Sequence, residues 1–350
     1  MQPVVRAIDV GFGYTKYVTH VEGNAITCDH FPSVAAASVS DPADRSWGGP
    51  RDTIALRVGQ MFYEAGPDID LALGNFRPQL PRTDDYVQAP GYLALLRIAM
   101  DYMRVDTIDL LVTGLPVGLY AAKKSALERL ATGDHPVSKG RVVRVKKALA
   151  VAQPQGALVS FAAGEGKLGR LRQYESLIID AGSRTFDWLV TRGMRLVTSR
   201  SNSVNRGVHN VLMMIADEIS HDIGEPFLDL EALDHALRKV RPLTLWGKPY
   251  SVEKYRPMIA PIAYDAVQSM LGTIGHKQRF EYVVVAGGGC HLFKKAIHEA
   301  LPQYRLDEVR EPMYANVRGY QIAGQAKLAP KAGAAPAVDA REAIEAGAET

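Results

Sequence analysis

The feature that most constrains the fold is a short acid-containing turn that occurs twice in the chain. The second copy begins with the apolar run 177–179, reaches Asp180, turns through residues 182–185 and continues into another apolar run. A short apolar run closed by turn residues is typical of a buried strand. The backbone N–H groups of such a turn can form a concavity that binds anions, phosphate above all. The segment therefore predicts a strand-turn-strand unit whose turn faces a phosphate.

The same pattern occurs near the N-terminus. One constant offset in residue number aligns Asp9 with Asp180 and Gly11 with Gly182, and both copies continue as a strand, a turn and a third strand. Two unrelated β-hairpins would also look alike at this level, so the repeat has two interpretations. As a duplicated three-strand unit, it predicts a nucleotide held in a cleft between two related domains.

Length and composition fit a protein of two domains, or three. The chain has 350 residues, of which 47% are hydrophobic and 23% are charged, as expected for a globular protein with a sizeable core. The net charge of +3 is too small to indicate a nucleic-acid-binding protein by itself. Cys28 and Cys290 lie far apart without metal-ligand spacing, which favours a reduced, cytoplasmic setting. We expect no signal peptide and no membrane span, because the chain opens directly into a strand and no apolar run is long enough.

A third glycine-containing turn follows the β-branched run 282–286. Here Gly287, Gly288 and Gly289 stand between a predicted strand and a predicted helix. This layout lets a backbone approach a phosphate or a sugar ring, although a glycine run after a strand is often only a sharp turn.

Other segments are less informative. Residues 32–90 are irregular and rich in proline and glycine, with predicted strands at 53–58 and 60–64. The stretch 139–147 alternates valine with arginine and lysine. It could be a basic strand that contacts DNA or a filament neighbour, or an edge strand kept soluble by its charges. We expect the alanine-, proline- and glutamate-rich segment 329–350 to be a disordered tail.

Taken together, five motifs in this order resemble the superfamily of actin, sugar kinases and heat-shock chaperone ATPases. The motifs are the acidic hairpin at 8–16, the Gln153-Pro154 turn, the acidic hairpin at 179–187, the triple glycine, and the small-residue helix at 315–319. Within the superfamily, the form of the first loop and the Ala-Asn-Val-Arg-Gly-Tyr segment are similar to the bacterial plasmid-segregation actins of the ParM/StbA type. The resemblance spans roughly residues 4–328.

The resemblance implies an α/β, actin-like fold with two related domains, each a ribonuclease-H-like unit, around a nucleotide cleft. Domain I would comprise residues 1–165, with 312–328 returning to it, and domain II would comprise residues 166–311. It also implies ATP, or GTP, and Mg²⁺ as cofactors. The catalytic residues would be Gln153, which orients the attacking water, and Asp180, which polarises it. Asp9 and Asp180 would hold the Mg²⁺.

The nucleotide itself would be held by three segments that the resemblance identifies. The residues are Asp9, Gly11, Phe12, Gly13, Tyr14, Thr15 and Lys16 in the first loop, Gly182, Ser183, Arg184, Thr185 and Asp187 in the second, and Gly287, Gly288 and Gly289 in the third. Ser183 and Arg184 depart from the family pattern, in which glycines and a small polar residue are usual. Arg184 could contact a phosphate or point to solvent.

The function implied by the resemblance is an ATPase that forms nucleotide-dependent filaments. In a plasmid partition system such a cytoskeletal filament would move DNA through an adaptor protein and would not bind DNA directly. Two alternatives remain at this point. One is an actin-like regulator that binds nucleotide without polymerising, and the other is a small-molecule kinase of the same superfamily.

Overall fold

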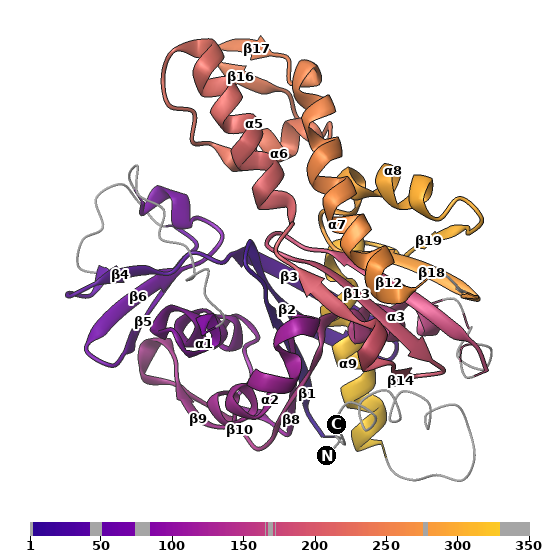
Figure 1. Ribbon diagram of the computed structural model, residues 1–350. Helices are drawn as coiled ribbons and strands as arrows, with labels where there is room; N and C mark the ends of the chain where they lie inside the picture. Colours follow the sequence, from indigo (N-terminus) through magenta and orange to yellow (C-terminus); the bar gives the residue numbers. More distant parts are fainter. Residues whose placement is uncertain are drawn as a thin grey trace.

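Two open β-sheets form the core of the two lobes of the molecule (Figure 1). The computed structural model describes residues 3–42, 51–73, 85–164, 166, 171, 173–275 and 279–329. The first sheet has the strand order β11-β8-β1-β2-β3, and we call the part built around it the first lobe. Its strands are β1 (Val5–Val10), β2 (Tyr14–Glu22), β3 (Ala25–Pro32), β8 (Leu110–Leu115) and β11 (Ala148–Ala152).

The second sheet has the order β14-β13-β12-β18-β19, with β15 also paired to β13, and forms the core of the second lobe. Its strands are β12 (Glu175–Ala181), β13 (Phe186–Arg192), β14 (Arg195–Leu196), β15 (Asn202–Val204), β18 (Tyr282–Ala286) and β19 (Leu306–Glu308). Both β12 and β18 are buried along almost their whole length, which is why they read as continuous apolar runs. The predicted strand at 282–286 is confirmed at both ends.

The two sheets share one connectivity. In each, the first strand pairs antiparallel with the next strand in the chain and parallel with a later one, β8 or β18. The register is also the same, since Asp9 faces Lys16 across the first hairpin and Asp180 faces Asp187 across the second. The repeat seen in the sequence is therefore a structural duplication, and not a chance likeness of two hairpins.

Eight α-helices lie among the described residues (Figure 1). They are α1 (Pro90–Tyr102), α2 (Val117–Ala131), α3 (Gln153–Gly164), α5 (Val208–Ile223), α6 (Leu230–Leu237), α7 (Ile259–Ile274), α8 (Cys290–Ala300) and α9 (Ala315–Leu328). Two starts differ from the sequence prediction. The segment 153–157 has the composition of a turn and predicts a helix only after it, but α3 begins at Gln153 itself. The helical spacing of apolar residues predicts a helix over 203–223, but α5 begins at Val208, because residues 202–204 pair with β13 as a strand.

Helices α3 and α9 lie between the two sheets and join the lobes. Helix α9 packs on β1 and β8 of the first sheet, and α3 packs on β12 of the second. At their crossing a Cβ added to Gly319 would lie 1.8 Å from the backbone oxygen of Gly156, so both helices approach on bare backbone. A helix rich in small residues, such as the one predicted at 315–319, is expected to pack closely on another helix, and this approach confirms it. The predicted domain boundaries at 165 and 311 stay a prediction.

Three small sheets extend the lobes. One contains β4 (Ala36–Ser38), β6 (Met61–Ala65) and β5 (Ile54–Val58), another contains β7 (Thr107–Ile108), β10 (Val142–Val145) and β9 (Gly133–Pro136), and the hairpin contains β16 (Leu243–Leu245) and β17 (Lys248–Tyr250). Helices α5 and α6 stand together with β16 and β17 at the far end of the second lobe (Figure 1). The 3₁₀ turns are Ile69–Leu71, Tyr86–Gln88, Ser138–Gly140, Thr198–Arg200, Glu253–Met258 and Pro312–Tyr314.

The edge-strand interpretation of the basic stretch 139–147 is wrong. Strand β10 is the middle strand of its sheet, with β7 on one side and β9 on the other. Arg144 of β10 contacts Asp134 on β9 at 2.8 Å, and Lys146, just after the strand, contacts Asp109 at 2.7 Å, so both charges are paired within the lobe. The alternation of valine with basic residues reflects one buried and one solvated face.

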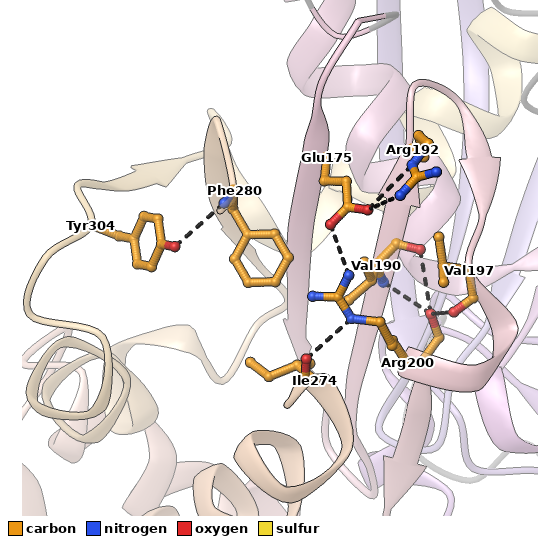
Figure 2. Close-up of polar contacts among 9 residues, drawn as sticks. Glu175, Val190, Arg192, Val197, Arg200, Ile274, Phe280 and Tyr304 are labelled. Carbon is orange, nitrogen blue, oxygen red and sulfur yellow. Dashed lines mark hydrogen bonds and ion pairs between the residues drawn. The ribbon is translucent and has the colours of Figure 1, made fainter. Parts of the chain in front are cut away.

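The end of the second sheet away from the α3–α9 crossing is held by an arginine network, which Figure 2 shows. Arg200 donates to Glu175 at the start of β12 (2.7 Å) and to the carbonyl oxygen of Ile274 at the end of α7 (3.1 Å). Arg192 donates to the same carboxylate, and the two arginines lower the pKa of Glu175. This network holds the first residue of β12, and Asp180 lies near the other end of the same strand.

No helix in the described part of the chain is long and apolar enough to cross a membrane. Residues 74–81, whose glycine and prolines predict a non-helical stretch, and the predicted tail from residue 330 lie outside the described residues.

Candidate functional site

The two acidic hairpins open onto one cavity of about 600 Å³ between the lobes. Asp9 lies near the end of β1 and Asp180 near the end of β12, and their side chains are only 1% and 5% exposed. The two turns meet there, since a Cβ added to Gly13 would lie 3.0 Å from the Ser183 side chain. The duplication therefore brings two carboxylates that lie 171 residues apart in the sequence (180 − 9) to one cavity.

Asp9 is held by two residues that the sequence also indicates. Gln153, at the start of α3, donates from Nε2 to Oδ1 of Asp9 at 2.9 Å, and Lys16 donates from Nζ to Oδ2 at 3.0 Å. Lys16 occupies the register position opposite Asp9, so the hairpin itself pairs the two charges. With its amide nitrogen committed to Asp9, Gln153 presents its carbonyl oxygen as an acceptor.

Asp180 is a buried carboxylate with a second acid, Asp187, close by. Burial, reinforced by the nearby charge of Asp187, raises its pKa to about 7, and the hydrogen bond from Asn316 partly opposes this shift. Asn316, in the first turn of α9, donates from Nδ2 to Oδ2 of Asp180 at 2.6 Å. A helix of the crossing between the lobes thus positions this acid.

The triple glycine forms the third wall. Gly287 has a φ of +88°, and a Cβ there would lie 2.2 Å from Oδ1 of Asp180. A Cβ at Gly289 would lie 2.3 Å from the Val208 side chain. Only glycine fits at these two positions, so the run is more than a sharp turn: it lets the strand-to-helix backbone lie directly against the acidic hairpin.

Nearly all of the predicted site residues line this cavity. They are Asp9, Gly11, Phe12, Gly13, Tyr14, Lys16, Gln153, Asp180, Gly182, Ser183, Arg184, Thr185, Asp187, Gly287, Gly288 and Gly289. Thr15 is absent from the lining: its side chain is fully buried behind the strand, where its hydroxyl meets that of Ser33 at 2.9 Å. Only its backbone remains a candidate for nucleotide contact.

Arg184 lines the cavity and lies over an aromatic ring of the other lobe. Its guanidinium carbon lies 5.9 Å from the ring centroid of Tyr86, in the 3₁₀ turn before α1, so it reaches from the second lobe onto an aromatic ring of the first. A cation over a ring face at this distance is weakly attracted to it. Its role towards a phosphate stays a prediction.

The fourth wall was missed from the sequence. Helix α6 contributes Glu231, Asp234 and Arg238 to the lining, and Arg238 is held by Asp234 at 2.8 Å while lying near Gly288. An acid and a base four residues apart on one helix turn indicate an ion pair, but nothing in that pattern points to a cleft. Asn316 belongs to the small-residue helix that the sequence indicates. Its contact with Asp180 was not predicted, because it depends on how α9 packs between the lobes.

The side chains fit a hydrated divalent cation. Asp9, Asp180 and Asp187 line the cavity, and Lys16 lies among them, so a bound cation would relieve their repulsion. Among the described residues there is no group of three or more histidine, cysteine or acidic side chains that could ligate a metal directly. Mg²⁺ often keeps several waters and takes one or two carboxylates plus phosphate oxygens, so this arrangement suits it.

Comparison with known families gives two matches. Residues 7–156 match the family described as actin like proteins N terminal domain, and residues 178–299 match the archaeal actin homologue MreB-like, C-terminal family. Together they cover most of the chain, and residues 157–177 lie between the two matches. None of the curated proteins searched matches the sequence.

Solved structures share the whole fold at low identity. The archaeal actin homolog Ta0583 is 21% identical, with a TM-score of 0.72 over 91% of this chain and 98% of that one. A 15-stranded ParM filament from Clostridium botulinum is 18% identical, with a TM-score of 0.69 over 93% and 99%, and the apo psk41 ParM protein is 18% identical, with a TM-score of 0.65 over 93% and 98%. Ta0583 has also been solved in complex with ADP. The expected two-domain α/β fold of the actin type is therefore confirmed.

Proposed function

This chain belongs to the actin-like proteins, and we propose that it is an ATPase that binds ATP or GTP with Mg²⁺ between its lobes and forms nucleotide-dependent filaments. The observation that carries the proposal is the pair of acidic hairpins in one register, Asp9 and Asp180, which face one cavity beside a backbone that only glycine permits. The filament and ADP-bound structures among its neighbours support the same reading.

We assign the roles as follows. Backbone N–H groups of residues 11–15 and 182–185 contact the β- and γ-phosphates, and residues 287–289 lie along the nucleoside. Asp9 and Asp180 hold the cation through its waters. Mg²⁺, when bound, neutralises the charge that develops on the phosphates.

The chain's own contribution to hydrolysis is positioning. Gln153, fixed by its bond to Asp9, offers its carbonyl oxygen to a water in line with the γ-phosphate. Asp180 lies on the opposite wall and polarises that water. Little covalent chemistry is needed, because phosphoryl transfer depends mainly on alignment and charge neutralisation.

The finer functional proposal is plasmid partition in the bacterial cytoplasm. In this proposal the filament moves plasmid DNA through an adaptor protein, as expected for the ParM/StbA type. Two basic residues of the stretch 139–147 favour an indirect contact with DNA, since Arg144 and Lys146 are already paired with acids within the lobe.

Light scattering and pelleting of the purified protein test assembly. We expect assembly with Mg²⁺ and ATP or GTP, and little with the diphosphate or without nucleotide. Phosphate release without assembly at high concentration would contradict the filament proposal, and phosphate appearing on a small-molecule acceptor would indicate a kinase. Binding without either would indicate a regulator.

A phosphate-release assay tests the site. Asp180→Ala should lower turnover on the order of 100-fold or more, because it removes a group aligned with the reacting phosphate. Asp134→Ala is the matched control, since Asp134 is an exposed acid of the first lobe that does not line the cavity. Equal turnover of both variants would remove Asp180 from the site.

A further inference from the structure

Helix α2 of the first lobe has no N-terminal cap from its own segment. It begins directly after Pro116, which has no side-chain hydrogen bond to the helix, and its first turn contains no acidic residue. The first N–H groups of a helix lack intrahelical partners and are usually satisfied by a capping side chain.

The missing cap comes from the second lobe. Asp187 on β13 accepts from the backbone N of Val117 at 2.8 Å, and Ser203 on β15 accepts from the backbone N of Gly118 at 2.8 Å. The two capping residues are a register pair between β13 and β15, and the Ser203 hydroxyl also donates to Oδ1 of Asp187 at 2.5 Å. We call Asp187 and Ser203 the cross-lobe cap.

The same carboxylate reaches the second phosphate loop. The hydroxyl of Thr185 donates to Oδ2 of Asp187 at 2.5 Å, so one side chain contacts the loop with one oxygen and helix α2 with the other. Asp187 is 1% exposed, and a carboxylate at that depth is costly unless donors surround it. Of the three donors described, one belongs to the other lobe.

We propose that Asp187 and Ser203 are positioning residues that couple the separation of the two lobes to the geometry of the phosphate loop 182–185. When the lobes lie together, α2 completes the donor set of Asp187, and Asp187 then holds Thr185 at the loop. When they separate, α2 loses both of its capping partners and Asp187 keeps only its donors within the second lobe. This inference rests on the proposed function only in that a nucleotide uses the loop.

The coupling has a direction. A ligand that extends to the loop 182–185 favours the arrangement in which the lobes lie together and the loop is held. A ligand shifts the equilibrium between the joined and the separated lobes only by binding one arrangement more tightly than the other. The cross-lobe cap should therefore raise affinity for a nucleoside triphosphate more than for a diphosphate.

The first arm of the test needs no nucleotide. Ser203→Ala should speed amide hydrogen exchange at Val117 and Gly118 about tenfold or more, while the later turns of α2 keep their exchange rates. Ser201→Ala is the matched control: among the described residues, the Ser201 hydroxyl bonds to Val190 and Val197, both within the second lobe. Unchanged exchange in Ser203→Ala, or the same change in both variants, would overturn the cross-lobe cap.

The second arm measures the dissociation constants of ADP and of the β,γ-imido analogue of ATP, both with Mg²⁺, by calorimetry. Ser203→Ala should weaken binding of the analogue about tenfold and that of ADP less than twofold, whereas Ser201→Ala should leave their ratio unchanged. Equal weakening of both ligands by Ser203→Ala would show a merely structural contact and overturn the coupling. If the unaltered protein binds neither ligand, the proposed function fails, and the first arm still decides whether the cap joins the lobes.

Discussion

Asp180 combines deep burial with a neighbouring negative charge, and its protonation should be visible in the stability of the protein. Burial, then the charge of Asp187, raises its pKa to about 7. A carboxyl whose pKa is higher in the folded than in the unfolded chain stabilises the fold below about pH 4. That stability is lost as the pH rises through the folded pKa. Without Mg²⁺ and nucleotide, its contribution should therefore decline between about pH 4 and pH 7.

We predict that Asp180→Asn removes this decline. The amide is neutral at every pH and can still accept the hydrogen bond from Asn316. At pH 8 the variant should be more stable than the unaltered protein by roughly 2–4 kcal/mol, since one pKa unit corresponds to about 1.4 kcal/mol. Urea unfolding at pH 5 and pH 8 measures the difference between the two proteins. If the free energy of unfolding depends on pH equally in both proteins, ionisation of Asp180 does not destabilise the fold.

At this scale the sequence predicts which residues gather in the cleft, but not what each side chain does there. Asp9, Asp180 and the glycines of their turns are found by repetition of a local pattern, and the triple glycine by its place between a strand and a helix together with the family resemblance. The contacts of Asp187 with Val117 and of Arg184 with Tyr86 join residues far apart in the chain. No local pattern encodes such contacts, because they depend on how the two lobes pack.

Among the elements, α3 and α9 are joined by the closest backbone approach. A Cβ at Gly319 would overlap backbone atoms of Gly156, which cannot move aside as a side chain would. We predict that Gly319→Ala destabilises the protein by about 1–3 kcal/mol or more, because the helices must separate. The matched control is Gly272→Ala on α7, where a Cβ meets nothing within 4 Å and the better helix propensity should add up to about 1 kcal/mol.

Thermal or urea unfolding of both variants checks this prediction. Opposite signs are expected for the two glycine-to-alanine changes, although both lie in helices. A small or stabilising effect of Gly319→Ala would contradict the prediction, because it would mean that a methyl group fits between α3 and α9.

Elements with strong periodicity were predictable, and short ones were not. Helix α5 and strand β18 have long apolar patterns, and they occur where the sequence indicates, apart from the residues of β15. The hairpin of β16 and β17 has three residues in each strand and turns through Trp246 and Gly247, both with positive φ. An Asn-Gly or Asp-Gly pair would have signalled such a turn, and tryptophan does not.

For the whole molecule, this hairpin bears on assembly. Trp246 is 68% exposed and has a φ of 49°, a conformation that bulky residues rarely adopt. Leu228 and Val240 flank helix α6 in the same part of the second lobe and are equally exposed. Exposed tryptophans are enriched among the residues that dominate protein interfaces, so we expect Trp246 to be buried between copies in the proposed filament.

We predict that Trp246→Asn raises the critical concentration for nucleotide-dependent assembly several-fold and leaves nucleotide affinity unchanged. Asparagine before glycine suits a two-residue turn with positive φ, so the fold should be as stable as before or more stable. Pelleting across protein concentrations, with calorimetry of nucleotide binding, checks both parts. Assembly at the original concentration would place the contact between copies elsewhere.

The cross-lobe cap also has a consequence for the order in which the chain becomes structured during its synthesis. Helix α2 emerges from the ribosome well before Asp187 and Ser203 exist, and at about 5–20 residues per second the delay is several seconds. Helix α9, which covers β1 and β8, follows much later still. During translation the first turn of α2 should therefore remain frayed. The nascent N-terminal lobe should become protease-resistant only after the second lobe, and then α9, have been made.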